Sequence, residues 1–157
     1  MKSKVKLSGY SLGVTIIVLG VLIAGLVFVE DKKSWFFLFT VTFLLLLFSF
    51  RYSPVKIQAD ENNVVIKCIT RRHKIKMNEV ESVELFQPTM ASFRLCGSGG
   101  FMGYWGIFKE GDIGRYAAYY GKASDCFLIR MKNGDKYVLG CENPEEIVNF
   151  INSQIRS

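Results

Sequence analysis

Two uncharged stretches dominate this chain: YSLGVTIIVLGVLIAGLVFV at residues 10–29 and SWFFLFTVTFLLLLFSF at residues 34–50. At about 1.5 Å of rise per residue, each helix would cross most or all of a bilayer core of roughly 30 Å. Within lipid a backbone must satisfy its own polar groups, and two short apolar stretches do so as helices. The charged tetrapeptide EDKK connects them at residues 30–33. We therefore predict a transmembrane helical hairpin over residues 1–51, with helices at about 10–29 and 34–50.

The basic residues around this hairpin predict its orientation. Lysine and arginine accumulate in cytoplasmic segments next to membrane helices. The connection holds two basic residues beside two acids, whereas six basic residues flank the helices: Lys2, Lys4, Lys6, Arg51, Lys56 and Lys67. We expect a multi-pass protein of the inner (plasma) membrane with both termini in the cytoplasm. The formal net charge of +6 is spread along the chain, so it does not predict a nucleic-acid partner, which needs a clustered basic face.

Small residues recur at helical spacing in the first apolar stretch. Gly9 and Gly13 form a G-x-x-x-G pair, and Gly20 and Ala24 have the same separation. Such spacings let membrane helices approach one another closely. They are consistent with a homo-oligomer or another membrane-protein partner, and also with packing inside one hairpin. We favour packing inside the hairpin, or the ordinary abundance of glycine in membrane helices, because such motifs recur often in membrane spans.

Beyond Arg51 the hydrophobic period changes to that of β-strands. Pro54 ends the helical pattern, and Asn133-Gly134 is the clearest hairpin signal in the chain. Strands are predicted at 55–59, 64–70, 71–77, 80–86, 105–109, 114–118, 125–131 and 136–139. A helix with one apolar face follows Asn143-Pro144. The predicted fold class is α+β, in which residues 52–157 form an open antiparallel β-barrel or sandwich capped by one C-terminal helix.

A basic segment follows the first predicted hairpin, and its four cations are Arg71, Arg72, Lys74 and Lys76. In a strand the last three share one face, opposite to His73 and Ile75. This face is either an ordinary solvated strand surface or a contact with anionic lipid, where each cation contributes about 1 kcal/mol. The sequence leaves both interpretations open.

The segment 94–106 mixes five glycines with four large side chains, which are Phe101, Met102, Tyr104 and Trp105. It lacks the Lys-Ser/Thr pair of a phosphate-binding loop, and a methionine stands where a dinucleotide-binding motif needs its third glycine. The glycines are expected to permit bends, bulges or close backbone approach. The large side chains either pack on the domain's own core, which we favour, or form an exposed wedge that binds a partner or the bilayer interface.

No combination of residues in this chain predicts catalysis. The four cysteines, at 68, 96, 126 and 141, are 28, 30 and 15 residues apart, and His73 is the one histidine. Zinc sites need closer ligand pairs, and a nucleophile needs an adjacent base. We therefore predict no catalytic residue, no metal and no cofactor. The thiols are expected to be buried and reduced.

Several segments together resemble bacterial pleckstrin-homology (PH) domains, a family in which strands are followed by one terminal helix. The matching segments are VVI at 64–66, VESVE at 80–84, Arg94, Gly97, GY at 103–104, GIF at 106–108, FLI at 127–129, Gly134, YVL at 137–139, NP at 143–144 and Phe150. The resemblance covers about residues 52–155. It implies a PH-like fold beside a membrane anchor and supplies no catalytic residue.

The resemblance implies a membrane-anchored binding or assembly module that is not an enzyme. Its cytoplasmic domain would be presented to a protein partner, to itself or to inner-leaflet lipid, including anionic lipid. The alternatives are a subunit of an oligomeric membrane complex or transporter, and an enzyme. Eukaryotic PH domains often bind phosphoinositides through basic residues at the first hairpin turn. Here that turn reads DENN at 60–63, which counts against phosphoinositide binding of that kind.

Overall fold

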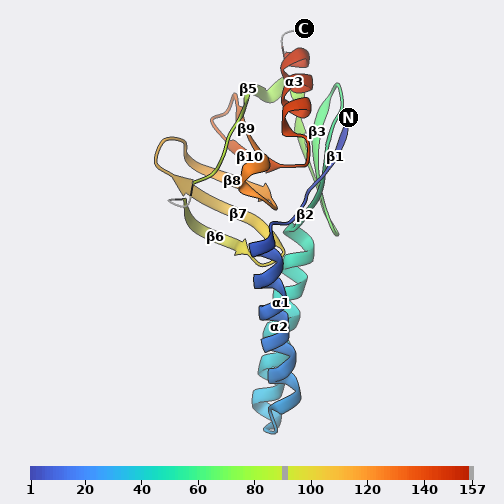
Figure 1. Cartoon of the computed structure of the whole chain (residues 1–157), viewed down its shortest axis with the longest axis vertical. Helices are drawn as coiled ribbons and strands as arrows, with labels where there is room; N and C mark the ends of the chain where they lie inside the picture. Colours follow the sequence, from blue (N-terminus) through green and yellow to red (C-terminus); the bar gives the residue numbers. More distant parts are fainter. Residues whose placement is uncertain (90–91, 156–157) are drawn as a thin grey trace.

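A long helical hairpin projects from a β-rich domain in the computed structural model, which describes residues 1–89 and 92–155 (Figure 1). The helices are α1 (Gly9–Phe28) and α2 (Lys32–Tyr52). Both begin at side-chain caps, since the Ser8 hydroxyl accepts from the Ser11 amide at 3.1 Å and the Asp31 carboxylate accepts from the Ser34 amide at 2.8 Å. These bounds agree with the predicted helices to within two residues.

The β domain consists of two sheets. The smaller has the order β1-β2-β3-β4, and its strands are β1 (Lys2–Lys4), β2 (Pro54–Ala59), β3 (Asn63–Cys68) and β4 (Arg72–Lys76). The larger has the order β5-β9-β10-β8-β7-β6. Its strands are β5 (Val80–Leu85), β6 (Phe93–Gly100), β7 (Gly103–Glu110), β8 (Gly114–Tyr120), β9 (Cys126–Met131) and β10 (Lys136–Gly140). Short 3₁₀ turns, η1 (Met77–Glu79) and η2 (Ala123–Asp125), precede β5 and β9.

The main core lies between the two sheets and the C-terminal helix α3 (Pro144–Ile155). Alternate residues of the central strands point inward, as the period of two requires, so that Ile57, Ile66 and Ile129 are fully buried. The apolar face of α3 covers β5, where the Asn152 amide donates to the Val83 carbonyl at 3.4 Å. A second, smaller cluster lies on the outer face of the larger sheet around Tyr116.

The predicted order of two apolar helices, a β-sheet domain and a terminal helix is confirmed. The two sheets do not close into a barrel. The prediction that all strand pairs are antiparallel is wrong, because β10 runs parallel to β8. The hairpin at Asn133-Gly134 reverses the chain after β9. The strand β10 is therefore antiparallel to β9, and it runs in the same direction as its other neighbour, β8.

Two strands were not foreseen from the sequence. Residues of the N-terminal tail form β1, in which Ser3 pairs with Ile57 of β2. The glycine-rich segment forms β6, which pairs with β7 along its whole length. As a result, the segments on both sides of the helical hairpin belong to the smaller sheet. The strand β1, which precedes α1, pairs with β2, which follows α2 (Figure 1).

Candidate binding surface at the helix-proximal end

The turn between β6 and β7, residues 100–103, contacts both helices of the hairpin. The Met102 amide donates to Thr15 Oγ1 of α1 at 2.9 Å, and the Met102 carbonyl accepts from Ser53 Oγ, just after α2, at 2.7 Å. Met102 adopts a φ of 54°, a left-handed conformation that exposes both backbone groups to these partners. We call this contact the helix joint. It fixes the helices to the domain through side chains that are far apart in the sequence.

Two facing glycines bend the β6–β7 hairpin toward the joint. Gly97 pairs with Gly106, and their φ angles are 111° and 121°. A Cβ at Gly97 would collide with the Trp105 carbonyl oxygen, and one at Gly106 with the Cys96 carbonyl oxygen. Only glycine fits at both places, because the two backbones approach too closely for a side chain.

The four large side chains of this hairpin are each half-buried and do not form one exposed wedge. Trp105 stacks on Tyr52 with 5.7 Å between ring centroids, and the Arg71 guanidinium lies 5.9 Å from the same Tyr52 ring. Tyr104 stacks on Tyr120, 4.8 Å away, on the outer face of the larger sheet. The stack of Trp105 on Tyr52 therefore reinforces the helix joint, because Trp105 belongs to β7 and Tyr52 ends α2. Phe101 and Met102 occupy the turn itself.

The structure separates the four predicted cations into two places. Arg71 and Arg72 lie at the β3–β4 turn beside the end of α2, where the Thr70 amide donates to the Phe50 carbonyl at 3.2 Å. Ile69, which the sequence did not single out, is half-exposed in the same turn. At the other end of β4, Lys76 forms an ion pair with Glu79 at 3.0 Å, and Lys74 lies between. The predicted alternation along β4 is confirmed, since Arg72, Lys74 and Lys76 are exposed and Ile75 is buried.

His73 and the cysteines do not form a reactive cluster. The His73 ring packs against two tyrosine rings, with centroid distances of 5.5 Å to Tyr137 and 6.3 Å to Tyr119. Burial, and secondarily the charge of Arg71, lowers the pKa of His73 below 6.5. Three thiols are buried as expected, but Cys96 is exposed on β6 because its strand lies at the edge of the sheet. Among the described residues no group of His, Cys, Asp or Glu side chains is suited to hold a metal.

This environment of His73 predicts an acid-sensitive stability. The folded-state pKa is depressed, so the unfolded chain binds more protons as the pH falls below about 6.5. The free energy of unfolding should therefore decrease between pH 7.5 and pH 5.5, and His73→Phe should reduce that decrease. The measurement is urea unfolding of the detergent-solubilised chain at both pH values. An equal pH dependence in the two proteins would contradict this role of His73.

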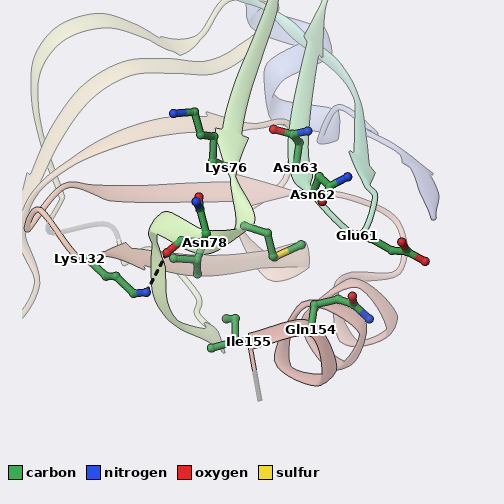
Figure 2. Close-up of a pocket in the computed structure, with 10 residues that line it drawn as sticks. Glu61, Asn62, Asn63, Lys76, Asn78, Lys132, Gln154 and Ile155 are labelled. Carbon is green, nitrogen blue, oxygen red and sulfur yellow. Dashed lines mark hydrogen bonds between the residues drawn. The ribbon is translucent and has the colours of Figure 1, made fainter. Parts of the chain in front are cut away.

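A cavity of about 460 Å³ opens at the end of the domain remote from the helices, between the β2–β3 turn, η1 and the end of α3 (Figure 2). Its two cations already have partners. Lys76 is paired with Glu79, and Lys132 Nζ donates to the Asn78 carbonyl at 2.8 Å. An anionic ligand would have to displace these contacts, so neither lysine is available to bind it.

The edge strand β6 carries the most exposed apolar side chains of the domain. Phe93 is 77% and Leu95 55% exposed, although both belong to a strand. In Figure 1, β6 is the strand of the larger sheet that lies nearest to the helical hairpin and extends to one side of it. The outer edge of β6 pairs with no strand among the described residues. This edge and the β3–β4 turn therefore flank the helices on two sides.

The small residues of α1 face away from α2. An added Cβ at Gly9, Gly13 or Gly20 would meet nothing within 4 Å, and Ala24 is exposed. Close packing within the hairpin occurs instead at Gly25, where a Cβ would lie 2.8 Å from Leu38 Cδ2. The structure thus leaves the glycine face of α1 open.

A family model described as "Bacterial PH domain" matches residues 55–155, which is most of the β domain and of α3. The chain belongs to this bacterial PH-domain family. No curated protein and no solved structure matches it. PH domains are generally non-catalytic binding modules. The helices that precede this PH domain, α1 and α2, have the length and mean hydropathy (2.6 and 1.8) of membrane spans.

Proposed function

We propose that this protein is a membrane-anchored binding and assembly module that holds its PH domain on the cytoplasmic surface of the inner membrane. The helix joint carries this proposal, because it ties the domain to the start of α1 and the end of α2 through Met102. A domain held by two hydrogen-bonded segments keeps a defined orientation toward the bilayer. A domain on a flexible linker would not.

With α1 and α2 in the bilayer, the helix-proximal end of the PH domain faces inner-leaflet lipid. On one side the β3–β4 turn brings Ile69, Arg71 and Arg72 close to the end of α2. On the other side runs the exposed edge of β6, which carries Leu95 and, at its end away from the helix joint, Phe93. Apolar side chains next to cations suit the boundary between acyl chains and anionic headgroups. The free edge of β6 could also pair with an extended segment of a protein partner.

Spin labels in reconstituted vesicles of phosphatidylethanolamine and phosphatidylglycerol test this placement. The labels are attached to Ile69→Cys and, as the matched control, to Lys132→Cys, both in a Cys96→Ser background. We expect the label at residue 69 to be accessible to oxygen and shielded from a water-soluble paramagnetic reagent. The label at residue 132, at the remote cavity, should show the opposite behaviour. Equal, water-like accessibility at both positions would overturn the proposed orientation.

The open glycine face of α1 favours a second function, assembly of this module with further copies of itself. The test is the double substitution of Gly13→Leu and Gly20→Leu, at positions where an added Cβ meets no atom of the monomer within 4 Å. If copies of the chain pack together on this face, the double variant should show much less chemical crosslinking between copies in membranes than the wild type. The domain itself should keep its thermal stability. Crosslinking at the wild-type level in the double variant would exclude this face as the interface. The same experiment bears on the alternative of a subunit of a membrane complex or transporter.

A further inference from the structure

A second cavity, of about 520 Å³, lies on the outer face of the larger sheet beside the start of α1. Three tyrosines line it: Tyr10 from α1, Tyr104 from β7 and Tyr120 from β8. Gly100, which ends β6, lies so close that an added Cβ would be 3.2 Å from the Tyr10 ring. The cavity therefore joins the PH domain to the first turn of the helix that, in the proposed function, enters the bilayer here.

Arg94 contributes the one cation of this cavity. Its side chain extends along the bent strand β6 as far as Gly99, where an added Cβ would lie 3.2 Å from Nη1. The lack of a side chain at Gly99 thus leaves room for the guanidinium. Within residues 1–89 and 92–155, Arg94 forms no hydrogen bond, ion pair or ring contact.

This guanidinium has no neutralising partner among the described residues, and the described lining of the cavity contains no acidic side chain. By contrast, both lysines of the cavity at the remote end of the domain have partners: Lys76 is paired with Glu79, and Lys132 donates to the Asn78 carbonyl. The nearby acid Glu110 is buried and accepts from the Thr89 amide at 3.0 Å and the Thr89 hydroxyl at 2.6 Å. Its carboxylate does not pair with Arg94. The cavity therefore combines an unneutralised planar cation with phenol groups, and no acidic side chain is among its described lining residues.

We infer that this cavity binds the phosphate of an inner-leaflet phospholipid headgroup, with Arg94 as the residue that holds the phosphate. A guanidinium donates two parallel hydrogen bonds to two phosphate oxygens, which a point charge such as lysine does not. The phenol groups of Tyr10 and Tyr104 can donate to the remaining oxygens. Because the cavity adjoins the first turn of α1, the acyl chains can stay in the bilayer along that helix. This inference rests on the proposed function, since it needs α1 to enter the membrane at this point.

Native mass spectrometry of the detergent-solubilised chain with added phosphatidylglycerol tests the site. The wild-type chain is expected to retain lipid adducts, and Arg94→Gln should reduce their population about tenfold. Gly99→Val keeps the charge but occupies the space of the guanidinium, so it should reduce the adducts as well. The matched control, Arg115→Gln, removes an exposed arginine of β8 outside this cavity and should leave them unchanged.

Further measurements identify the ligand and distinguish a failure of phosphate binding at Arg94 from a failure of membrane anchoring. Dioleoylglycerol, which has no phosphate, should give no retained adduct, and millimolar inorganic phosphate should not displace the phospholipid. Displacement by phosphate alone would overturn the assignment to a lipid, as would equal adducts in wild type and Arg94→Gln. Insertion of the same variants into vesicles, measured by flotation, reports on the membrane anchor. Arg94→Gln should float like the wild type, so the loss of lipid binding and a failure of anchoring give different results.

Discussion

Native Cys96 is expected to react with a membrane-impermeant maleimide only after cells are permeabilised, whereas Lys33→Cys in a Cys96→Ser background should react in intact cells. Both positions are exposed, so access across the membrane decides the outcome. The other native thiols are buried, and burial raises the pKa of Cys68 to about 11 and raises that of Cys126 and Cys141. Because the thiolate is the reactive form, they contribute little labelling. The expected contrast is nearly all-or-none.

The control for this topology experiment is Lys74→Cys in the same Cys96→Ser background. Lys74 is exposed on β4, on the opposite sheet from β6, so it should behave as Cys96 does. Labelling of Cys96 and Lys74→Cys in intact cells would place the PH domain outside the cytoplasm. That result would remove the basis for inner-leaflet contact by Arg71 and Arg72. It would also require the thiols to be reconsidered in an oxidising compartment.

The parts of the fold that depend on local patterns were predictable from the sequence. The two apolar runs specify α1 and α2 without any long-range contact, because length and the absence of charge suffice. The hairpin of β9 and β10 follows from Asn133-Gly134, where Gly134 adopts a φ of 89°. The apolar face and the acidic first turn of α3 likewise identify it as a helix that covers a core.

The parts that depend on long-range pairing were not predictable. The strand β1 is three residues long and rich in lysine, and it exists because β2 offers it a free edge. The strand β6 contains three glycines, which have low strand propensity, so tertiary pairing with β7 overrides the local preference. The parallel pairing of β8 with β10 leaves no trace in the periodicity of either strand, because both directions use the same alternation.

The candidate surfaces show the same division. The alternation along β4 identified its basic face, but only the structure shows that Arg71 and Arg72 lie beside α2 while Lys76 is engaged by Glu79. Arg94 was part of a recognised glycine-rich segment, yet nothing local indicates that its guanidinium reaches Gly99 next to Tyr10. A lone cation within glycines is a weak signal. Its neighbourhood depends on the bend that Gly97 and Gly106 impose on the hairpin.

That bend predicts a large effect of the smallest possible substitution. Gly106→Ala should lower the free energy of unfolding by about 3–5 kcal/mol, because its Cβ would collide with backbone that cannot move without separating β6 from β7. The midpoint of thermal unfolding in detergent should fall by roughly 10–20 °C. Since the same hairpin carries Met102, amide hydrogen exchange should also increase in the 100–103 turn at the helix joint.

Two further glycines separate the contributions to this effect. Gly134→Ala introduces a side chain at a positive φ in open space, so it should cost about 1–2 kcal/mol from backbone strain alone. Gly111→Ala has open space and no positive φ, and it should change stability by less than about 0.5 kcal/mol. The order Gly106, Gly134, Gly111 tests whether close approach of two backbones builds the hairpin. If Gly106→Ala cost no more than Gly134→Ala, strain at φ would suffice, and the paired glycines would not be what holds Met102 against α1.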